Sequence, residues 1–258
     1  MEKTKQQILD LWHQVNRPGQ VNRPGIEDLI KFLEKSDFFT APCSMNHHLA
    51  YPGGLAIHSL NVHRLLTEKC RLYQTIQKGI TILDEEVIVA ALGHDLCKVN
   101  YYKEGGEPCS DAQYNFLNSL LNRICWEDEP VSVRERIFSS EGKLKRSIPG
   151  NHATILIDWL KNRRFDPMPE LPMVYSVNDQ LPLGHGEKSL SILQDFISLT
   201  DDEKLAIRWH MGPTEPGTHF NYPSGYAFRA AMERSPLVTL LFTADLEASQ
   251  ILEGEKKP

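Results

Sequence analysis

The chain has 258 residues and a formal net charge of −6, with 28 Lys and Arg against 34 Asp and Glu. It is 41% hydrophobic and 24% charged, which is typical of a folded globular protein and excludes a disordered chain. No run of about 18 apolar residues occurs, which excludes a transmembrane helix. The negative charge argues against a protein that coats nucleic acid, because that mode of binding needs a basic surface.

The N-terminus and the cysteines bear on the cellular compartment. The N-terminal stretch MEKTKQQILDLWHQ is polar and amphipathic and lacks the apolar core of a secretory signal. The five cysteines form no CxxC pair and leave one odd thiol, which is unlike a disulfide framework. These features predict a reduced, cytoplasmic protein.

Helical hydrophobic periodicity recurs along most of the chain, and no convincing alternating strand occurs. Asp84 is a candidate N-cap, and Thr200 with the acidic residues after it is typical of a helix start. Residues 103–172 are more polar and irregular, and a short extended piece is expected at 173–180. The pattern predicts an all-α protein of eight to ten helices, including 4–14, 26–35, 55–78, 85–98, 152–164, 187–198, 201–210 and 235–253.

Two aspartates and four histidines lie in apolar or helix-edge surroundings. His94 and Asp95 lie together in VIVAALGHDL, and Asp245 lies in VTLLFTADLEA. An isolated buried carboxylate is expensive unless a cation neutralises it. Each residue alone has a plainer explanation, as a hydrogen-bonded core histidine or as an aspartate paired with Lys or Arg. Together they indicate one shared cation site, made by His58, His94, Asp95, His185, His210 and Asp245.

In this order the six residues resemble the HD-domain superfamily of metal-dependent phosphohydrolases. Its core pattern is H…HD…D, and members with two extra histidines hold two metal ions. The segment ALGHDLCK is similar to the family's L-x-HD-x-x-K helix, and Ala244-Asp245 is similar to its closing motif. His47-His48 and the YPGGL that precedes His58 are similar to the start of the HD domain in HD-type 3′–5′ exoribonucleases. The resemblance implies a single helical-bundle domain with N-terminal helices at 1–44, a core at 45–102 and 180–253, and an irregular insertion at 103–172.

The resemblance also implies a set of metal ligands. His58, His94, Asp95 and Asp245 are expected to bind one divalent ion, and Asp95 is expected to bridge to a second ion completed by His185 and His210. Imidazole and carboxylate ligands suit Fe, Mn, Ni, Co or Zn without selecting one of them. A pair of such ions lowers the pKa of a bridging water and clamps phosphoryl oxygens, so Asp95 is expected to be catalytic.

Further residues are expected to contact the substrate. A lysine at the position of Lys98 points at the substrate phosphate in the resembled families, which gives Lys98 an expected role in catalysis and substrate binding. Lys188 is a second candidate for the phosphate, and His48 and His219 are candidate substrate contacts. For each of these residues the plainer alternative is a solvated or structural side chain.

The leading interpretation is a metal-dependent phosphohydrolase that cleaves a phosphoester of a nucleotide or short oligonucleotide by a metal-bridging hydroxide. A small phosphorylated partner and no membrane are expected, and the oligomeric state stays open. HD-type oxygenases use a similar ligand set to hold two irons, so a di-iron oxygenase is the first alternative. A metal-stabilised sensor or binding module is the second, although every expected ligand is present in the chain.

Overall fold

The computed structural model describes residues 2–16, 23–45, 47–122, 135, 137–162, 169, 171–214 and 223–254. Within them the protein is all-α, as predicted, with a single two-stranded sheet of β1 (Tyr102–Glu104) and β2 (Tyr175–Val177). The helices are α1 (Glu2–Gln14), α2 (Ile26–Lys35), α3 (Gly54–Ile76), α4 (Asp84–Gly93), α5 (Asp111–Leu121), α7 (Gly150–Asn162), α8 (His185–Gln194), α9 (Asp201–Arg208), α10 (Pro223–Arg234) and α11 (Pro236–Glu247).

The chain divides into two compact units, one of residues 1–102 with 178–258 and one of residues 103–177. In the smaller unit α5 packs against α7 around Leu117, Leu156 and Trp159. Ser110 caps α5, because its hydroxyl accepts the backbone N–H of Gln113 at 3.2 Å. The polar sequence of this unit hides α5, which the periodicity did not predict.

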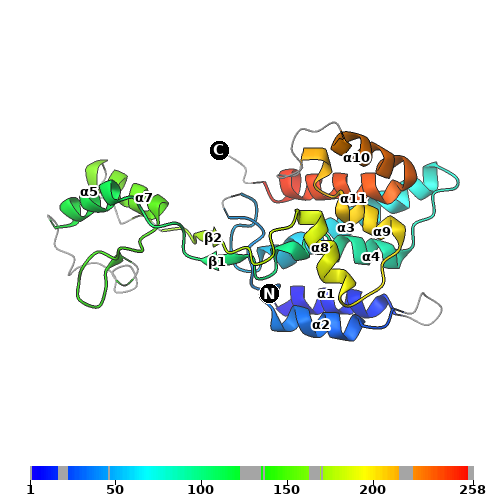
Figure 1. The fold of residues 1–258 in the computed structure, drawn as a ribbon, viewed down its shortest axis with the longest axis horizontal. Helices are drawn as coiled ribbons and strands as arrows, with labels where there is room; N and C mark the ends of the chain where they lie inside the picture. The colour runs from blue at the N-terminus through cyan, green and yellow to red at the C-terminus, as the bar shows by residue number, and fades with distance from the viewer. Residues whose placement is uncertain are drawn as a thin grey trace. The chain divides into compact units, whose positions relative to one another are not determined.

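The larger unit is built around α3 and α4, which lie side by side at its centre (Figure 1). Every residue of α4 except Asp84 is buried, and from Val87 to Gly93 the sequence is apolar on all faces. One face contributes Ile88 and Leu92 to a core shared with α1, α2 and α8. The other face contributes Val87 and Ala91 to a core shared with α9 and α11. Burial on both sides holds the C-terminal end of α4 rigidly in the middle of the bundle.

The helix predicted at 85–98 is interrupted at the predicted metal ligands His94 and Asp95. α4 ends at Gly93, and after His94 and Asp95 the chain continues as a 3₁₀ turn at Leu96–Lys98. A side chain at Gly93 would lie 2.6 Å from Leu193 Cδ1, so glycine permits the close approach of α8 at this point. Asp95 is therefore held at a bend between two packed elements.

A second close contact joins α8 to α9. A Cβ at Gly186 would lie 2.2 Å from the carbonyl oxygen of Arg208, so only glycine fits there. This contact places the start of α8, with His185, beside the end of α9, which leads into His210.

The predicted C-terminal helix at 235–253 changes its winding before it ends. α11 stops at Glu247 and is followed by a π-helical stretch at Ala248–Leu252. The helix α10 at Pro223–Arg234 was not predicted, because the turn-rich sequence before it masks its start. None of the helices in the described residues combines the length and hydrophobicity that crossing a bilayer requires.

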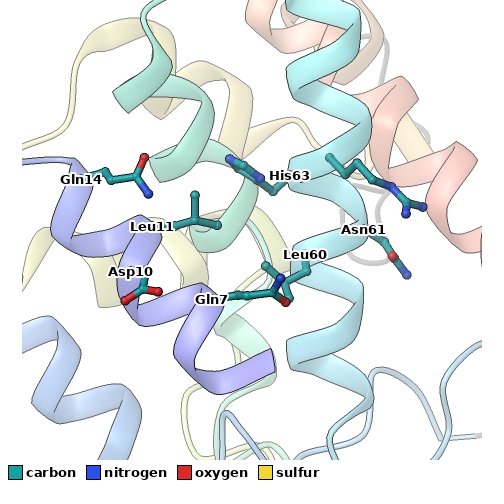
Figure 2. A pocket seen from close by; sticks show the side chains of 8 residues that line it. Gln7, Asp10, Leu11, Gln14, Leu60, Asn61 and His63 are labelled. Atoms are coloured by element: carbon teal, nitrogen blue, oxygen red, sulfur yellow. The ribbon is translucent and has the colours of Figure 1, made fainter. Parts of the chain in front are cut away.

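A cavity of about 480 Å³ lies between α1 and α3 (Figure 2). Gln7, Leu11 and Gln14 of α1 face His63 of α3 across it. None of the residues predicted to bind metal or substrate lines this cavity, so the candidate chemistry lies elsewhere in the unit.

Candidate metal centre

Four elements of the larger unit deliver five of the predicted ligands to one place. They are the first turns of α3, the bend after α4, the segment just after α9 and the last turn of α11. The three histidines and Asp95 are at most 2% exposed, and the Asp245 side chain is 15% exposed. The residues brought together are His58, His94, Asp95, His210 and Asp245.

The imidazole Nε2 atoms of this cluster converge on the Asp95 carboxylate. The Nε2 atoms of His58 and His94 are each 3.5 Å from Asp95 Oδ2, and His210 Nε2 is 3.6 Å from Asp95 Oδ1. His58 Nε2 is also 3.1 Å from Asp245 Oδ1 and 3.3 Å from His94 Nε2. Two ligand atoms about 2.1 Å from a shared metal ion lie roughly 3.0–3.5 Å apart at octahedral or tetrahedral angles. The distances between these nitrogen and oxygen atoms are therefore close to those between neighbouring ligands of one metal ion.

Hydrogen bonds on the other side of two rings fix which nitrogen faces the cluster. His94 Nδ1 donates to the carbonyl of Ala91 at 2.8 Å, and His210 Nδ1 donates to the carbonyl of Ile207 at 2.7 Å. In the neutral form of each ring Nε2 then carries the lone pair, which is the form that binds metal. His210 Nε2 is buried and has no hydrogen-bond partner among the described residues. In the neutral ring the Nε2 lone pair of His210 faces the Asp95 carboxylate, and either a proton or a metal ion between them relieves the repulsion, so the residues fit a divalent transition-metal ion.

A second group of ligand atoms shares Asp95 with the first. Asp95, Cys97 and His185 bring one ligand atom each within 4.8 Å of one another. Cys97 Sγ is 3.3 Å from His185 Nδ1 and 3.8 Å from Asp95 Oδ1. The Ser189 hydroxyl accepts the backbone N–H of Cys97 at 3.0 Å and ties α8 to the turn. Asp95 thus stands between two candidate positions for an ion.

Neighbouring charges and burial shift the pKa values of the clustered residues. Burial would raise the pKa of Asp95, but Lys98 and His94 hold it well below its usual range. Burial would likewise raise the pKa of Asp245, and the hydrogen bond with His58 lowers it. Burial lowers the pKa of His94 to about 4, so this ring is neutral at physiological pH. The cluster therefore offers two carboxylates and a neutral imidazole to a cation.

Two other histidines hold protons that a metal ion would displace. Burial would lower the pKa of His58 and His210, but their anionic neighbours raise it above 6.5 in both. Both rings are therefore protonated at lower pH and deprotonate as the pH rises through the raised pKa, so we expect metal affinity to increase with pH. Calorimetric titration in two buffers of different ionisation enthalpy should detect proton release on binding, and heats that do not depend on the buffer would contradict it.

Both lysines predicted to contact substrate are paired with carboxylates. Lys98 Nζ lies 2.6 Å from Asp95 Oδ2 and 3.6 Å from Cys43 Sγ. Lys188 Nζ lies 2.5 Å from Asp179 Oδ1 and over the ring of Tyr101. The ammonium group of Lys98 thus lies next to a candidate ligand, and that of Lys188 is held by Asp179 in the same unit.

The remaining candidate substrate contacts are two histidines. His48 Nε2 is 3.3 Å from Cys43 Sγ, and its ring centroid is 5.3 Å from that of His58. His219 lies outside the described residues. His48 therefore borders the cluster through Cys43 and His58.

Sequence reasoning missed Cys43, Cys97 and Glu253 at this site. Burial would raise the pKa of the Cys43 thiol, but Lys98 and His58 lower it to about 7. Glu253 accepts from His58 Nδ1 at 2.9 Å although it lies in the charged tail LEGEKKP. Cys97 could have been predicted, because it lies two residues after Asp95 in the sequence. Nothing local in the sequence indicates that Cys43 or Glu253 is buried.

The fold and the site define an all-α protein with a buried His and Asp cluster that could hold metal ions. Among curated proteins the chain is similar to the dihydroneopterin 2′,3′-cyclic phosphate phosphodiesterase of Methanocaldococcus jannaschii, with 24% identity over 144 residues. The matched region is 54% of this chain and 55% of that protein, so it spans about half the length of this relative. No family model matches the chain, and no solved structure matches it.

Proposed function

We propose that this chain is an HD-domain, metal-dependent phosphohydrolase that cleaves a phosphoester of a nucleotide-like molecule. The observation that carries the proposal is the convergence of three imidazole Nε2 atoms on the Asp95 carboxylate at 3.5–3.6 Å. The relative named as a cyclic phosphate phosphodiesterase supports hydrolysis over oxygen activation. The proposal includes a single HD-type domain in which residues 103–172 are an insertion.

The proposed ligands divide into two sets that share Asp95. His58, His94, Asp95 and Asp245 would hold one ion, and Asp95, His185 and His210 would hold the other. When bound, the ions supply a water of lowered pKa and positive charge for the phosphoryl oxygens. The carboxylates of Asp95 and Asp245 would neutralise part of the charge of two buried divalent ions.

The two lysines define where the phosphate would lie. Lys98 Nζ is 2.6 Å from Asp95, so its ammonium group lies beside the shared carboxylate. Lys188 follows His185 on the same helix, and Asp179 holds its ammonium group. A phosphate between these groups would accept hydrogen bonds from both lysines, and the charge-assisted form of these bonds orients the scissile ester. Since His48 borders the cluster, it is the proposed further substrate contact, and His219 is retained as a second.

The substrate we expect is a small 2′,3′-cyclic phosphate of a nucleoside or pteridine, because the relative is named for one. Protein reconstituted with Mn²⁺ would be assayed on dihydroneopterin 2′,3′-cyclic phosphate, a nucleoside 2′,3′-cyclic phosphate and a dinucleotide. Hydrolysis in isotopically labelled water should place one labelled oxygen in the product phosphate. Oxygen uptake by a di-iron form, without release of a phosphoester product, would favour the oxygenase instead.

A further inference from the structure

Glu253 and Asp245 contact opposite nitrogens of the same imidazole. Asp245 Oδ1 lies 3.1 Å from His58 Nε2, and both carboxylate oxygens of Glu253 lie near Nδ1, at 2.9 and 3.2 Å. The side chains of His58 and Glu253 are each 1% exposed. One C-terminal segment therefore approaches this ring from two sides.

The π-helical stretch explains how two residues eight positions apart reach one ring. In an uninterrupted α-helix eight residues turn about 80° beyond two full turns, which would place them on different faces. The backbone N–H of Glu253 instead donates to the carbonyl of Ala248 at 3.0 Å, a reach of five residues. A π-helix turns less per residue than an α-helix, so this stretch returns Glu253 towards the face of Asp245.

The surroundings of Glu253 form a built site for its carboxylate. Asn61 Nδ2 donates to Glu253 Oε1 at 2.8 Å, and His48 Nε2 lies 3.9 Å from Oε2. Asn61 extends from α3, as Figure 2 shows. A buried carboxylate costs free energy unless its oxygens are paired, and here Asn61 and His58 of α3 donate to them.

We propose that Glu253 is a positioning residue that accepts the Nδ1–H of His58 and so directs the Nε2 lone pair of His58 towards Asp95 and Asp245. This inference rests on the proposed metal-dependent function and extends it to the C-terminal segment. The backbone carbonyls of Ala91 and Ile207 do the same for His94 and His210. Among these three rings only His58 has a side chain as the acceptor of its Nδ1–H. A carboxylate in this position also makes the imidazole a more basic metal ligand.

The test compares Glu253→Gln, which nearly conserves size, with Glu247→Gln as the matched control. Glu247 lies on α11 and pairs with Lys69 at 2.6 Å, remote from His58 in its contacts. Zinc affinity would be measured by competition with a chromophoric chelator. Glu253→Gln should weaken it by about 10- to 100-fold, and Glu247→Gln should leave it unchanged.

A second readout separates positioning from general stability. In zinc-loaded protein with nitrogen-labelled histidine, long-range proton–nitrogen spectra should show His58 protonated at Nδ1 and metal-bound at Nε2. Glu253→Gln should alter this pattern, and Glu253→Asp, which keeps the carboxylate, should restore part of the zinc affinity. Unchanged affinity and an unchanged His58 pattern in Glu253→Gln would overturn this inference while the metal centre stands. Failure of the wild-type chain to bind zinc would instead overturn the proposed function, and the inference with it.

Discussion

Asp95→Asn should abolish both metal binding and hydrolysis. Asp95 belongs to both groups of ligand atoms, the one with His58 and His94 and the one with Cys97 and His185. Its loss therefore removes the ligand that the two proposed ions share. Metal ions supply several kcal/mol of transition-state stabilisation, and losing about 4 kcal/mol lowers the rate about a thousandfold. Elemental analysis and the cyclic phosphate assay would measure the two losses.

Two controls separate this effect from unfolding. Asp95→Asn also leaves the buried ammonium of Lys98 without its carboxylate partner, which is destabilising in itself. Adding Lys98→Met removes that charge, and the double variant should be folded and still free of metal. Asp10→Asn, at an exposed position on α1, should leave metal content and rate unchanged. Two ions and full turnover in Asp95→Asn would show that the site is assigned to the wrong residues.

Glu203→Gln should destabilise the larger unit by about 3–5 kcal/mol, which is typical when one partner of a buried ion pair is removed. Arg23 and Glu203 form two parallel hydrogen bonds, at 2.7 and 2.8 Å, and their side chains are 1% and 0% exposed. Arg23 also donates to the carbonyl of Ser198 at 2.9 Å, and Thr200 N–H donates to Glu203 at 2.8 Å. Chemical denaturation would measure the lost free energy of unfolding.

An exposed ion pair on α10 provides the control for this prediction. Arg229 and Glu233 are 3.0 Å apart with side chains 76% and 66% exposed. Glu233→Gln should change stability by less than about 1 kcal/mol, because solvent screens such pairs. Replacing Arg23 and Glu203 together by apolar residues should cost less than Glu203→Gln alone, since no charge is left unpaired. Equal effects of Glu203→Gln and Glu233→Gln would contradict the role given to the buried pair.

The sequence was most informative where a polar residue interrupts an apolar helix. His94 and Asp95 in VIVAALGHDL and Asp245 in VTLLFTADLEA could be expected to share a site, because buried polar groups need partners. The helix periodicity also predicted the all-α class, and the start signal at Thr200 located the first residue of α9.

Other features could not be read from local patterns. The bend at Asp95 depends on α8 packing against Gly93, a contact between segments about 100 residues apart. Glu253 resembles a solvated charge in sequence, and its burial depends on the π-helical stretch and on His58 nearly 200 residues away. The pKa of Cys43 is lowered chiefly by Lys98 and His58, which the fold brings to it.

The most direct measurement of the central claim is the number of metal ions per chain, by elemental analysis of protein purified anaerobically without chelator or affinity metal. The proposed centre predicts about two transition-metal ions per chain, lost in Asp95→Asn and retained in Asp10→Asn. A chain that holds no metal even after reconstitution would contradict it, and the buried histidines and aspartates would then be a hydrogen-bonded core network.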